Sequence, residues 1–275
     1  MQGLYGIIQG AASVVAIIFS IIWSKNYNVS KWKAIPICIT SQFLGFIIVF
    51  LLTWIENGFT KFGAQNAIRF YPFLLLIGFL EAKVFKEDFL KVIEFQAVTM
   101  PLTYGLGHFA CLIPNCCSGF HYQPGTIGFT IANALTGTDQ LPLQIFESVS
   151  ALLIFVITVI IAIKTKFKIK GYLFALYHVL FGFTRFLWEF LRDNQKIIQF
   201  GPINGATSSF ESNGVAMWGI SNLAIWSLAI LIIGIGLFIV LKIYHNKQEQ
   251  KQKETTTVSW YTKFKNTAII IVVFF

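Results

Sequence analysis

The sequence predicts an all-α, polytopic membrane protein with about seven transmembrane helices, its N-terminus outside and its C-terminus in the cytoplasm. Three observations lead to this fold class. The 275-residue chain is 56% hydrophobic and only 12% charged, about half the charged fraction of a soluble domain. Its 29 Phe, 7 Trp and 9 Tyr supply more apolar surface than a disordered chain carries. Its apolar runs are apolar on all sides, whereas the strands of a membrane β-barrel alternate.

Seven apolar runs have the length and composition expected of membrane-spanning helices. The expected spans are 4–23, 35–54, 70–85, 95–114, 144–163, 171–191 and 215–243. Residues 1–243 are therefore expected to form one transmembrane domain, followed by a basic cytoplasmic tail at 244–275. The stretch 267–275 is apolar but too short to cross a bilayer. Because no basic residue precedes the first run, we expect it to be a retained span and not a cleaved signal peptide.

The distribution of Lys and Arg predicts the orientation of these spans. Sixteen of the 21 cations fall in 24–33, 83–94, 164–170 and 242–266, and four fall in the connections between those segments. Cations gather on the cytoplasmic side of membrane proteins, which places the N-terminus outside. The net charge of +9 therefore reflects membrane topology, and we expect no nucleic acid partner.

Two connections on the predicted outer side are unusual. Residues 115–143 contain no Lys or Arg and are rich in Gly, Thr, Asn and Pro. A connection of this length is uncommon without a function, so we expect it to form a lid or an interfacial arm at the outer face of the membrane. Residues 197–214, rich in Gly, Ser and Asn, are expected to form a second outer loop.

The sixth apolar run carries the densest set of ionisable residues. Arg185 lies four residues before Glu189, and Arg192 lies three residues after it, so the three share one helical face, with His178 two turns below. Gly182 lies beside this face and would allow a neighbouring helix or ligand to approach closely. The three charges either satisfy one another or bind an anionic lipid headgroup. We favour the second interpretation because ionisable residues inside spans are costly and usually functional.

A second polar cluster closes the fourth run. Tyr104, His108 and Cys111 lie on one face at i, i+4 and i+7. The full cluster comprises His108, Cys111, Cys116, Cys117 and His121. Its spacing matches no familiar zinc pattern, so the sequence favours no metal. A disulfide between Cys111 and Cys116 is possible on an oxidising face of the membrane.

A third cluster opens the fifth run. Pro142 suits the first turn of a helix, and the charge of Glu147 favours a helix N-terminus. Gln144 and Glu147 are three residues apart, which puts them on one face. They lie at the outer end of their span, as the other two clusters do, so we expect the three clusters to converge on one site.

The order of these motifs resembles that of the prolipoprotein diacylglyceryl transferases, enzymes of the bacterial inner membrane. The most specific match is 181–192. There the family pattern is Tyr-Gly-x-x-Arg-Phe-x-x-Glu-x-x-Arg, and the residues in register are Gly182, Arg185, Phe186, Glu189 and Arg192. Residues 141–147 are similar to the family motif His-Pro-Ser/Thr-Gln-Leu-Tyr-Glu. The resemblance covers about residues 85–243.

The family's central signature, Gly-Arg-x-Gly-Asn followed after five residues by Glu-x-x-Gly, is matched more loosely at 107–119. A branch of the family carries Gly-Cys-Cys-x-Gly there, which 115–119 (Asn-Cys-Cys-Ser-Gly) resembles. This chain departs from the family's Arg, Asn, Glu and Tyr at four positions, where it carries His108, Cys111, Cys116 and Phe181.

The resemblance implies transfer of a diacylglyceryl group from phosphatidylglycerol to the thiol of a lipobox cysteine, in a multi-pass protein of the bacterial plasma (inner) membrane. The implied partners are phosphatidylglycerol, prolipoprotein signal segments and membrane lipid, with no cofactor. Arg185 oriented by Glu189 would neutralise the departing phosphate, and His108 would take the thiol proton. The expected substrate-binding residues are Gln144, Glu147, Asn115, Gly119, Gly182 and Arg192.

Two other functions stay open at this point. A catalytically degenerate family member would bind phospholipid or signal segments without transferring anything. A thiol-redox or metal-handling membrane protein would instead use Cys111, Cys116 and Cys117. In that second case alkylation of the cysteines would abolish activity, whereas replacement of Arg185 would be tolerated.

Overall fold

The computed structural model describes residues 2–56, 58–60, 67–166, 171–211 and 213–273, and these are mostly helical. The chain divides into two units within one helix, with the boundary between Ile235 and Gly236. The second unit is helical as far as Val273. Three lysines counted for the orientation, at 61, 168 and 170, and the end of the apolar tail at 274–275 lie outside the described residues.

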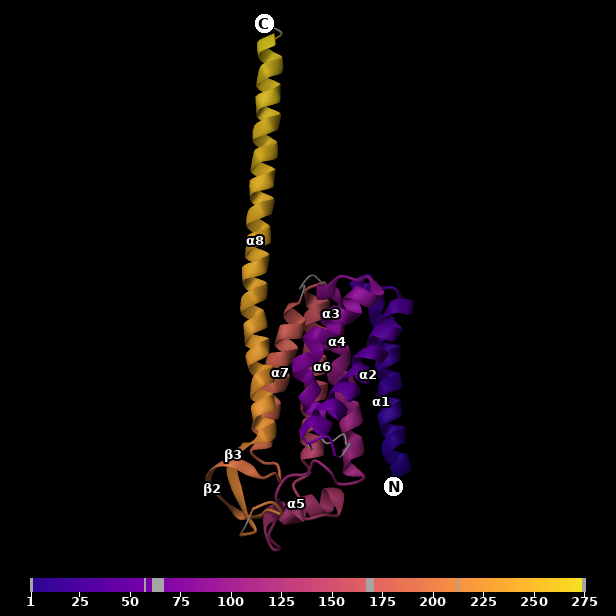
Figure 1. The fold of residues 1–275 in the computed structure, drawn as a ribbon, viewed down its shortest axis with the longest axis vertical. Helices are drawn as coiled ribbons and strands as arrows, with labels where there is room; N and C mark the ends of the chain where they lie inside the picture. Colours follow the sequence, from indigo (N-terminus) through magenta and orange to yellow (C-terminus); the bar gives the residue numbers. More distant parts are fainter. Residues whose placement is uncertain (1, 57, 61–66, 167–170, 212, 274–275) are drawn as a thin grey trace. The chain divides into compact units, whose positions relative to one another are not determined.

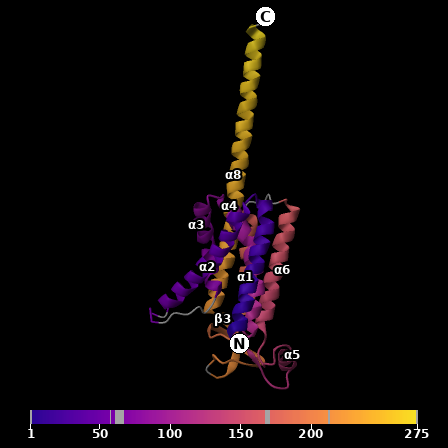
Figure 2. The ribbon, with the colours of Figure 1, turned by 90° about the vertical axis from the view of Figure 1, so that its right-hand side faces the viewer.

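The first unit is a helical bundle with a small cap at one end (Figure 1; Figure 2). The bundle contains α1 (Gln2–Ser24), α2 (Lys31–Glu56), α3 (Leu74–Phe85), α4 (Phe89–His108), α6 (Leu143–Lys164) and α7 (Tyr172–Glu189). The last long helix, α8 (Asn222–Val273), enters this unit with its first residues. Short helical turns lie at Lys25–Tyr27, Ala67–Phe73 and Phe109–Leu112.

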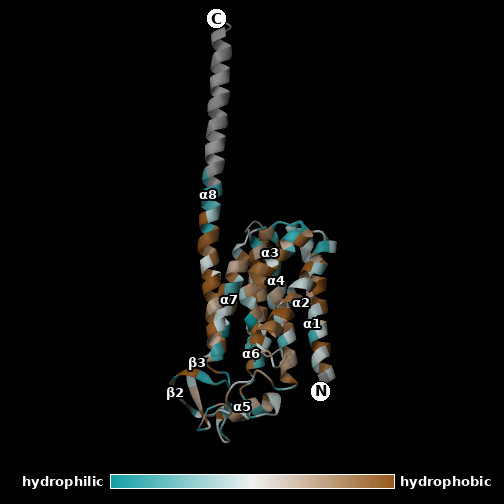
Figure 3. Ribbon diagram, viewed as in Figure 1, coloured by the Kyte–Doolittle hydropathy of each residue, from teal (hydrophilic) through white to brown (hydrophobic). Residues whose placement is uncertain are grey.

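Among the residues that the structure describes, four helical segments are long and apolar enough to cross a membrane: Gly3–Tyr27, Lys31–Glu56, Leu143–Lys164 and Asn222–Gln248. Hydrophobic residues cover the sides of the bundle, and hydrophilic residues gather in the connections at its ends (Figure 3). On α6 the exposed apolar side chains are Phe146, Val149, Leu153, Val156, Ile157, Ile160 and Ile163. A surface this apolar is suited to lipid and not to water, so the chain is a mostly helical membrane protein.

The central helix of the bundle is α4, which packs against α1, α2, α3, α6 and α7. Every residue from Val92 to Leu102 is buried, so this helix lies inside the bundle although it carries polar residues. Glu94 is 2% exposed and accepts a hydrogen bond of 3.2 Å from the backbone N–H of Leu173. The carboxylate thus satisfies one of the donors left free at the start of α7.

Glu81, the acidic residue in the expected third span, also accepts hydrogen bonds from neighbouring side chains. Glu81 of α3 accepts hydrogen bonds from Thr40 (2.7 Å) and Ser41 (2.8 Å) of α2 and from Gln96 (2.9 Å) of α4. α3 has 12 residues, fewer than a helical span needs. The side chain of Glu81 therefore joins three helices inside the protein.

The expected span 215–243 is wrong at its start. Residues Val215–Ser221 form strand β3, which pairs antiparallel with β2 (Lys196–Thr207). The helix begins at Asn222, where the hydroxyl of Ser221 accepts a hydrogen bond of 3.2 Å from the backbone N–H of Ala224, as an N-cap side chain does. The expected outer loop 197–214 overlaps β2 as far as Thr207, so most of it belongs to this hairpin.

The cap is built from this hairpin, the two-residue strand β1 (His121–Tyr122) and helix α5 (Ile127–Thr136). The strands form an antiparallel sheet in the order β1-β2-β3. A small apolar core formed by Phe120, Ala206 and Ala216 joins the sheet to the chain before β1. Helix α5 lies within the expected lid 115–143, and its Ile127, Ile131 and Leu135 are 81%, 54% and 60% exposed. Their spacing places them on one face of α5.

Candidate active site

The three polar clusters meet at the end of the bundle that carries the cap. The segment around Gly119 lies between two other segments and pairs with both. The N–H of Gly119 donates to the carbonyl of Leu141 (2.8 Å), and the N–H of Phe120 donates to the carbonyl of Leu191 (3.2 Å). An isolated bridge also joins Gly119 to Arg192. These backbone bonds hold the chain after α4, the start of α6 and the end of α7 together.

Two of the expected site residues are glycines because backbone passes too close for a side chain. A Cβ on Gly119 would lie 2.6 Å from the carbonyl oxygen of Leu191, and a Cβ on Gly182 would lie 2.5 Å from the backbone nitrogen of Leu231. Real Cβ atoms essentially never approach other atoms so closely. Gly119 therefore permits the pairing of three segments, and Gly182 permits the close packing of α7 on α8.

Glu147 of α6 is the centre of the site. Its Oε1 accepts hydrogen bonds from Nη1 of Arg185 and Nη2 of Arg192, both on or just after α7. Its Oε2 lies 2.6 Å from Nε2 of His108 and accepts a hydrogen bond of 3.2 Å from the hydroxyl of Tyr104. One carboxylate from α6 therefore holds side chains from α4 and α7.

Glu189 is the second carboxylate of the site. Its Oε1 accepts from Nη2 of Arg185 at 2.7 Å and lies 3.1 Å from Nε of Arg192. Its Oε2 accepts from Asn194 (3.0 Å) and from Ser221 (3.2 Å) at the end of β3. The charged group of α7 is in this way attached to the cap as well as to α6.

The charges of this group balance within a dry environment. The side chains of Glu147 and Glu189 are fully buried, and those of Arg185 and Arg192 are 2% and 4% exposed. Unpaired charges at such depth would be very costly, and here two guanidinium groups face two carboxylates. The Nε of Arg185 is buried with no hydrogen-bond partner among the described residues, so the guanidinium retains a donor for a further acceptor.

Aromatic rings lie against the polar group on its bundle side. Tyr104 stacks on His108 with ring centroids 4.9 Å apart and contacts Phe181 edge-to-face at 5.1 Å. Tyr71 packs on Phe181 at 4.4 Å. These rings exclude water from the side of the site that faces the bundle, which strengthens the electrostatic interactions within it.

The chain after α4 brings the cysteines to the same place. Gln144 donates from Nε2 to the carbonyl of Cys116 (2.6 Å), and Asn115 donates from Nδ2 to Gln140. These two expected binding residues thus hold the turn that carries Cys116 and Cys117. Cys117 has a φ of 67°, a left-handed conformation that is uncommon for a residue with a side chain.

The four cysteines are free thiols in the structure, so the possible disulfide between Cys111 and Cys116 is not formed. Hydrogen bonds with Cys111 and Cys116, together with the charge of Arg192, hold the pKa of Cys117 well below its usual range. A hydrogen bond with Cys111 favours the thiolate of Cys116, but a hydrogen bond with Cys117 and burial raise its pKa to about 11. The two adjacent thiols therefore differ in acidity.

Two histidines near these motifs in the sequence lie apart from the site. His178 is bonded to backbone carbonyls of Phe174 (3.0 Å) and Tyr71 (3.4 Å) inside the bundle. His121 lies in the cap, with Nδ1 3.0 Å from Asp139 and Nε2 3.0 Å from the hydroxyl of Ser209. The five-residue Cys and His cluster of the sequence therefore does not converge as a whole.

Sequence reasoning missed several residues that hold the site together. Nζ of Lys196 donates to the carbonyls of Glu189 (2.8 Å) and Arg192 (2.9 Å), which caps the end of α7. Asn194 and Ser221 bind Glu189 as described above. Lys196 and Ser221 belong to the hairpin that was expected to be loop and helix, so the sequence contained no signal for their contacts.

The chain is similar in sequence to proteins of one family. A family model described as prolipoprotein diacylglyceryl transferase matches residues 4–240. A phosphatidylglycerol–prolipoprotein diacylglyceryl transferase of Chlorobaculum tepidum is 28% identical over 152 residues, covering 54% of this chain and 52% of that protein. A protein of the same description from Clostridium tetani is 27% identical over 150 residues, covering 53% of this chain and 56% of that protein. The aligned region thus spans about half the length of these curated relatives.

Proposed function

Because the chain belongs to the prolipoprotein diacylglyceryl transferase family, we propose that it transfers a diacylglyceryl group from phosphatidylglycerol to the thiol of a lipobox cysteine. The observation that carries this proposal is the pair of buried guanidinium groups, Arg185 and Arg192, held by Glu147 and Glu189. A guanidinium fork fits the oxygens of a phosphate. The same site residues that hold one another in the free protein would hold the phospholipid headgroup.

The reaction requires an acceptor for the negative charge of the leaving group. The thiol sulfur bonds to the glycerol carbon that carries the phosphate, the carbon–oxygen bond breaks, and glycerol phosphate leaves with the electron pair. Arg185, oriented by Glu189, stabilises the charge that develops on that phosphate. Its unpartnered Nε is one donor for this purpose, and the N–H group now bonded to Glu147 is another. Arg192 adds a second positive charge at the same place.

The reaction also requires an acceptor for the thiol proton. His108 presents Nε2 to Glu147 at 2.6 Å, and its Nδ1 lies 3.8 Å from Cys111 Sγ. The Glu147 carboxylate lies against Nε2 and orients the imidazole, as a carboxylate partner does for a general base. Nδ1 is then the nitrogen that takes the proton of the incoming thiol.

The remaining expected residues act through these groups. Gln144 and Asn115 position the turn that carries Cys116. Gly119 allows the segments that bear His108, Glu147 and Arg185 to approach one another, and Gly182 allows α7 to pack closely on α8. We assign them positioning roles, with the phospholipid headgroup bound between Arg185 and the cap.

We propose that residues 1–243 form one domain that crosses the bacterial plasma membrane seven times, with the N-terminus outside and a cytoplasmic tail at 244–275. The excess of lysines in the connections opposite the cap supports this orientation. The cap then lies at the outer face, where prolipoprotein signal segments and phosphatidylglycerol are both within reach. The exposed apolar face of α5 would lie in the lipid interface as an arm over the substrate.

A direct assay tests this function. The full chain in lipid nanodiscs is mixed with phosphatidylglycerol labelled in its acyl chains and with a peptide that contains a lipobox cysteine. We expect label on the peptide, none on a peptide with serine in place of that cysteine, and none with Arg185→Ala. Lipid binding by folded wild-type protein without labelled peptide would overturn the proposal and favour a degenerate, lipid-binding family member.

A further inference from the structure

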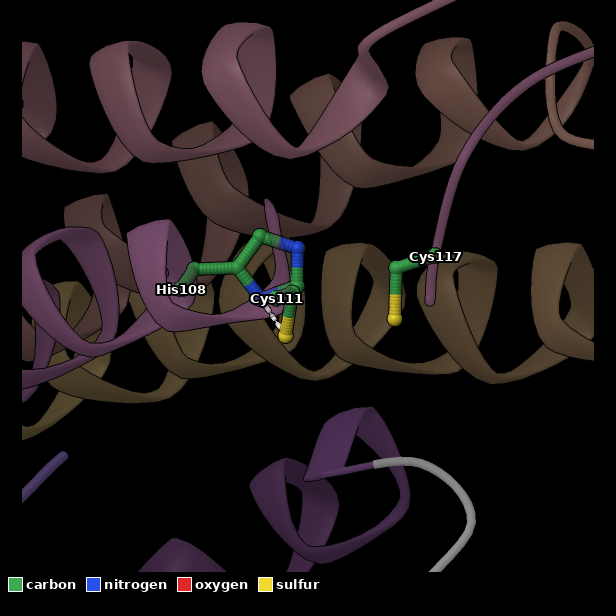
Figure 4. A group of neighbouring side chains, drawn as sticks. All are labelled: His108, Cys111 and Cys117. Carbon is green, nitrogen blue, oxygen red and sulfur yellow. Dashed lines mark hydrogen bonds between the residues drawn. The ribbon is translucent and has the colours of Figure 1, made fainter. Parts of the chain in front are cut away.

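Three side chains at the edge of the proposed active site form a group of which the transfer mechanism above uses only His108. His108 at the end of α4, Cys111 in the turn that follows and Cys117 in the next loop gather at one place (Figure 4). Their nearest nitrogen and sulfur atoms all lie within 4.8 Å of one another. Nδ1 of His108 lies 3.8 Å from Sγ of Cys111. One imidazole and two thiols at this separation are ligands that bind thiophilic metal ions.

We propose that His108, Cys111 and Cys117 bind a zinc ion, with one coordination position left open. With metal–sulfur and metal–nitrogen bonds of about 2.3 and 2.1 Å, tetrahedral ligand atoms lie about 3.5 to 3.8 Å apart. The His108–Cys111 pair already has this separation, at 3.8 Å. The widest separation between two of the three ligand atoms is at most 4.8 Å. Zinc binding would shorten it by about 1 Å, and small rotations of the cysteine side chains move the sulfur atoms that far.

The surroundings of His108 support this assignment. A histidine that binds zinc through one ring nitrogen usually presents the other to a carboxylate, which fixes the ring and raises its basicity. Nε2 of His108 lies 2.6 Å from Oε2 of Glu147, while Nδ1 faces Cys111. The partner that a zinc-bound histidine needs is thus in place on the opposite side of the ring.

The partial exposure of the group also fits an open site. Cys111 is buried, whereas Cys117 and His108 are partly exposed. Sites with three protein ligands leave a fourth position for water or substrate. Cys116 is next to Cys117 in the chain but lies outside the group of three, and its Sγ instead faces the carbonyl of Cys111 at 3.9 Å. Its thiol also contacts those of Cys111 and Cys117, so the control for Cys117 is Cys38, which is buried on α2.

An open position on zinc beside two arginines suits a thiol substrate. This step rests on the proposed function and refines it. The lipobox thiol would bind as a thiolate, its proton passing to water instead of to Nδ1 of His108, since a thiol on zinc is deprotonated. The zinc-bound sulfur then bonds to the glycerol carbon as the carbon–oxygen bond breaks, and glycerol phosphate leaves with that electron pair.

Zinc binding by the full chain tests the site itself. Reduced protein in detergent is depleted of metal and divided into two portions. One portion is titrated with zinc alone, and the other with cobalt alone to reveal thiolate charge-transfer bands. We expect one zinc per chain. Cys111→Ser and Cys117→Ser should each weaken binding by more than about tenfold, because a tenfold loss is already typical of a change next to the ligands. Cys38→Ser should bind as the wild type does.

Three results would overturn the zinc site: no zinc retained by reduced wild-type protein, equal loss in Cys38→Ser and Cys117→Ser, or a Cys111–Cys117 disulfide in protein isolated from cells. Circular dichroism of each variant shows whether it is folded. The transfer assay then separates the two proposals. If the protein binds zinc but transfers no diacylglyceryl group, with or without zinc, the proposed function is refuted and the zinc site stands. If the zinc-free and zinc-loaded proteins transfer the group at equal rates, only the activation by zinc is refuted.

Discussion

The carboxylate of Glu147 on α6 lies 2.6 Å from Nε2 of His108 at the end of α4. The same carboxylate accepts hydrogen bonds from Arg185 and Arg192, so one acidic group joins the proposed phosphate-binding and thiol-binding halves of the site. Both oxygens are engaged and the side chain is fully buried. A change at Glu147 should for this reason affect stability as well as activity.

We predict that Glu147→Gln destabilises the protein by about 3 to 5 kcal/mol, because Glu189 alone then faces two arginines and one buried positive charge is left uncompensated. Thermal unfolding of the full chain in detergent measures this loss. Glu87→Gln serves as the matched control, since Glu87 pairs with the partly exposed Lys33 and such a pair contributes about 1 kcal/mol or less. Equal melting temperatures for the two variants would contradict the central role of Glu147.

Arg185→Lys should lower kcat/KM by about a hundredfold, as expected when one donor to a developing charge is lost. A lysine keeps the charge but lacks the fork that reaches both Glu147 and Glu189. Initial rates of peptide labelling measure the effect. Arg69→Lys is the control, because Arg69 pairs with Glu56 outside the site. Wild-type rates in Arg185→Lys would show that the fork is not needed.

Gly119→Ala should separate the segments that build the site. The added Cβ would meet the carbonyl of Leu191 at 2.6 Å, and backbone cannot move aside as a side chain can. We expect a loss of about 1 to 3 kcal/mol from overpacking together with loss of transfer. In Gly10→Ala, where a Cβ meets nothing within 4 Å, stability should rise slightly. A fully stable and active Gly119→Ala variant would show that the close approach is dispensable.

The apolar face of α5 should contact lipid. A photo-crosslinking amino acid at position 131 is expected to label phospholipid in nanodiscs, because Ile131 is 54% exposed on the face shared with Ile127 and Leu135. The same amino acid in place of Asn133, on another part of the helix, should label little lipid. Equal labelling from both positions would argue against an interfacial arm.

Helical spacing explains how much of the site the sequence could predict. Arg185 and Glu189 are one turn apart, so any helix through them forms their ion pair, observed at 2.7 Å. The position of each cluster at the end of its apolar run was also enough to expect that the clusters meet. These predictions depend only on local periodicity and on the length of a span.

The rest depends on contacts between segments. Glu147 was expected to be one binding residue among several, and only the packing of α4, α6 and α7 shows that His108, Arg185 and Arg192 all face it. Val215–Ser221 is apolar and leads directly into the apolar helix that follows, so the run of hydrophobic residues did not separate strand from helix there. The sequence spacing of Cys111 and Cys117 matches no zinc pattern, and their approach to His108 comes from the turn between them.

Complementation tests the central claim of diacylglyceryl transfer most directly. A bacterium depleted of its own transferase would express the chain, and lipid labelling of a reporter lipoprotein would be measured. The account predicts labelling by the wild type and none by Arg185→Ala at equal membrane levels. Absence of labelling by well-expressed wild-type protein, or equal labelling by Arg185→Ala, would contradict it.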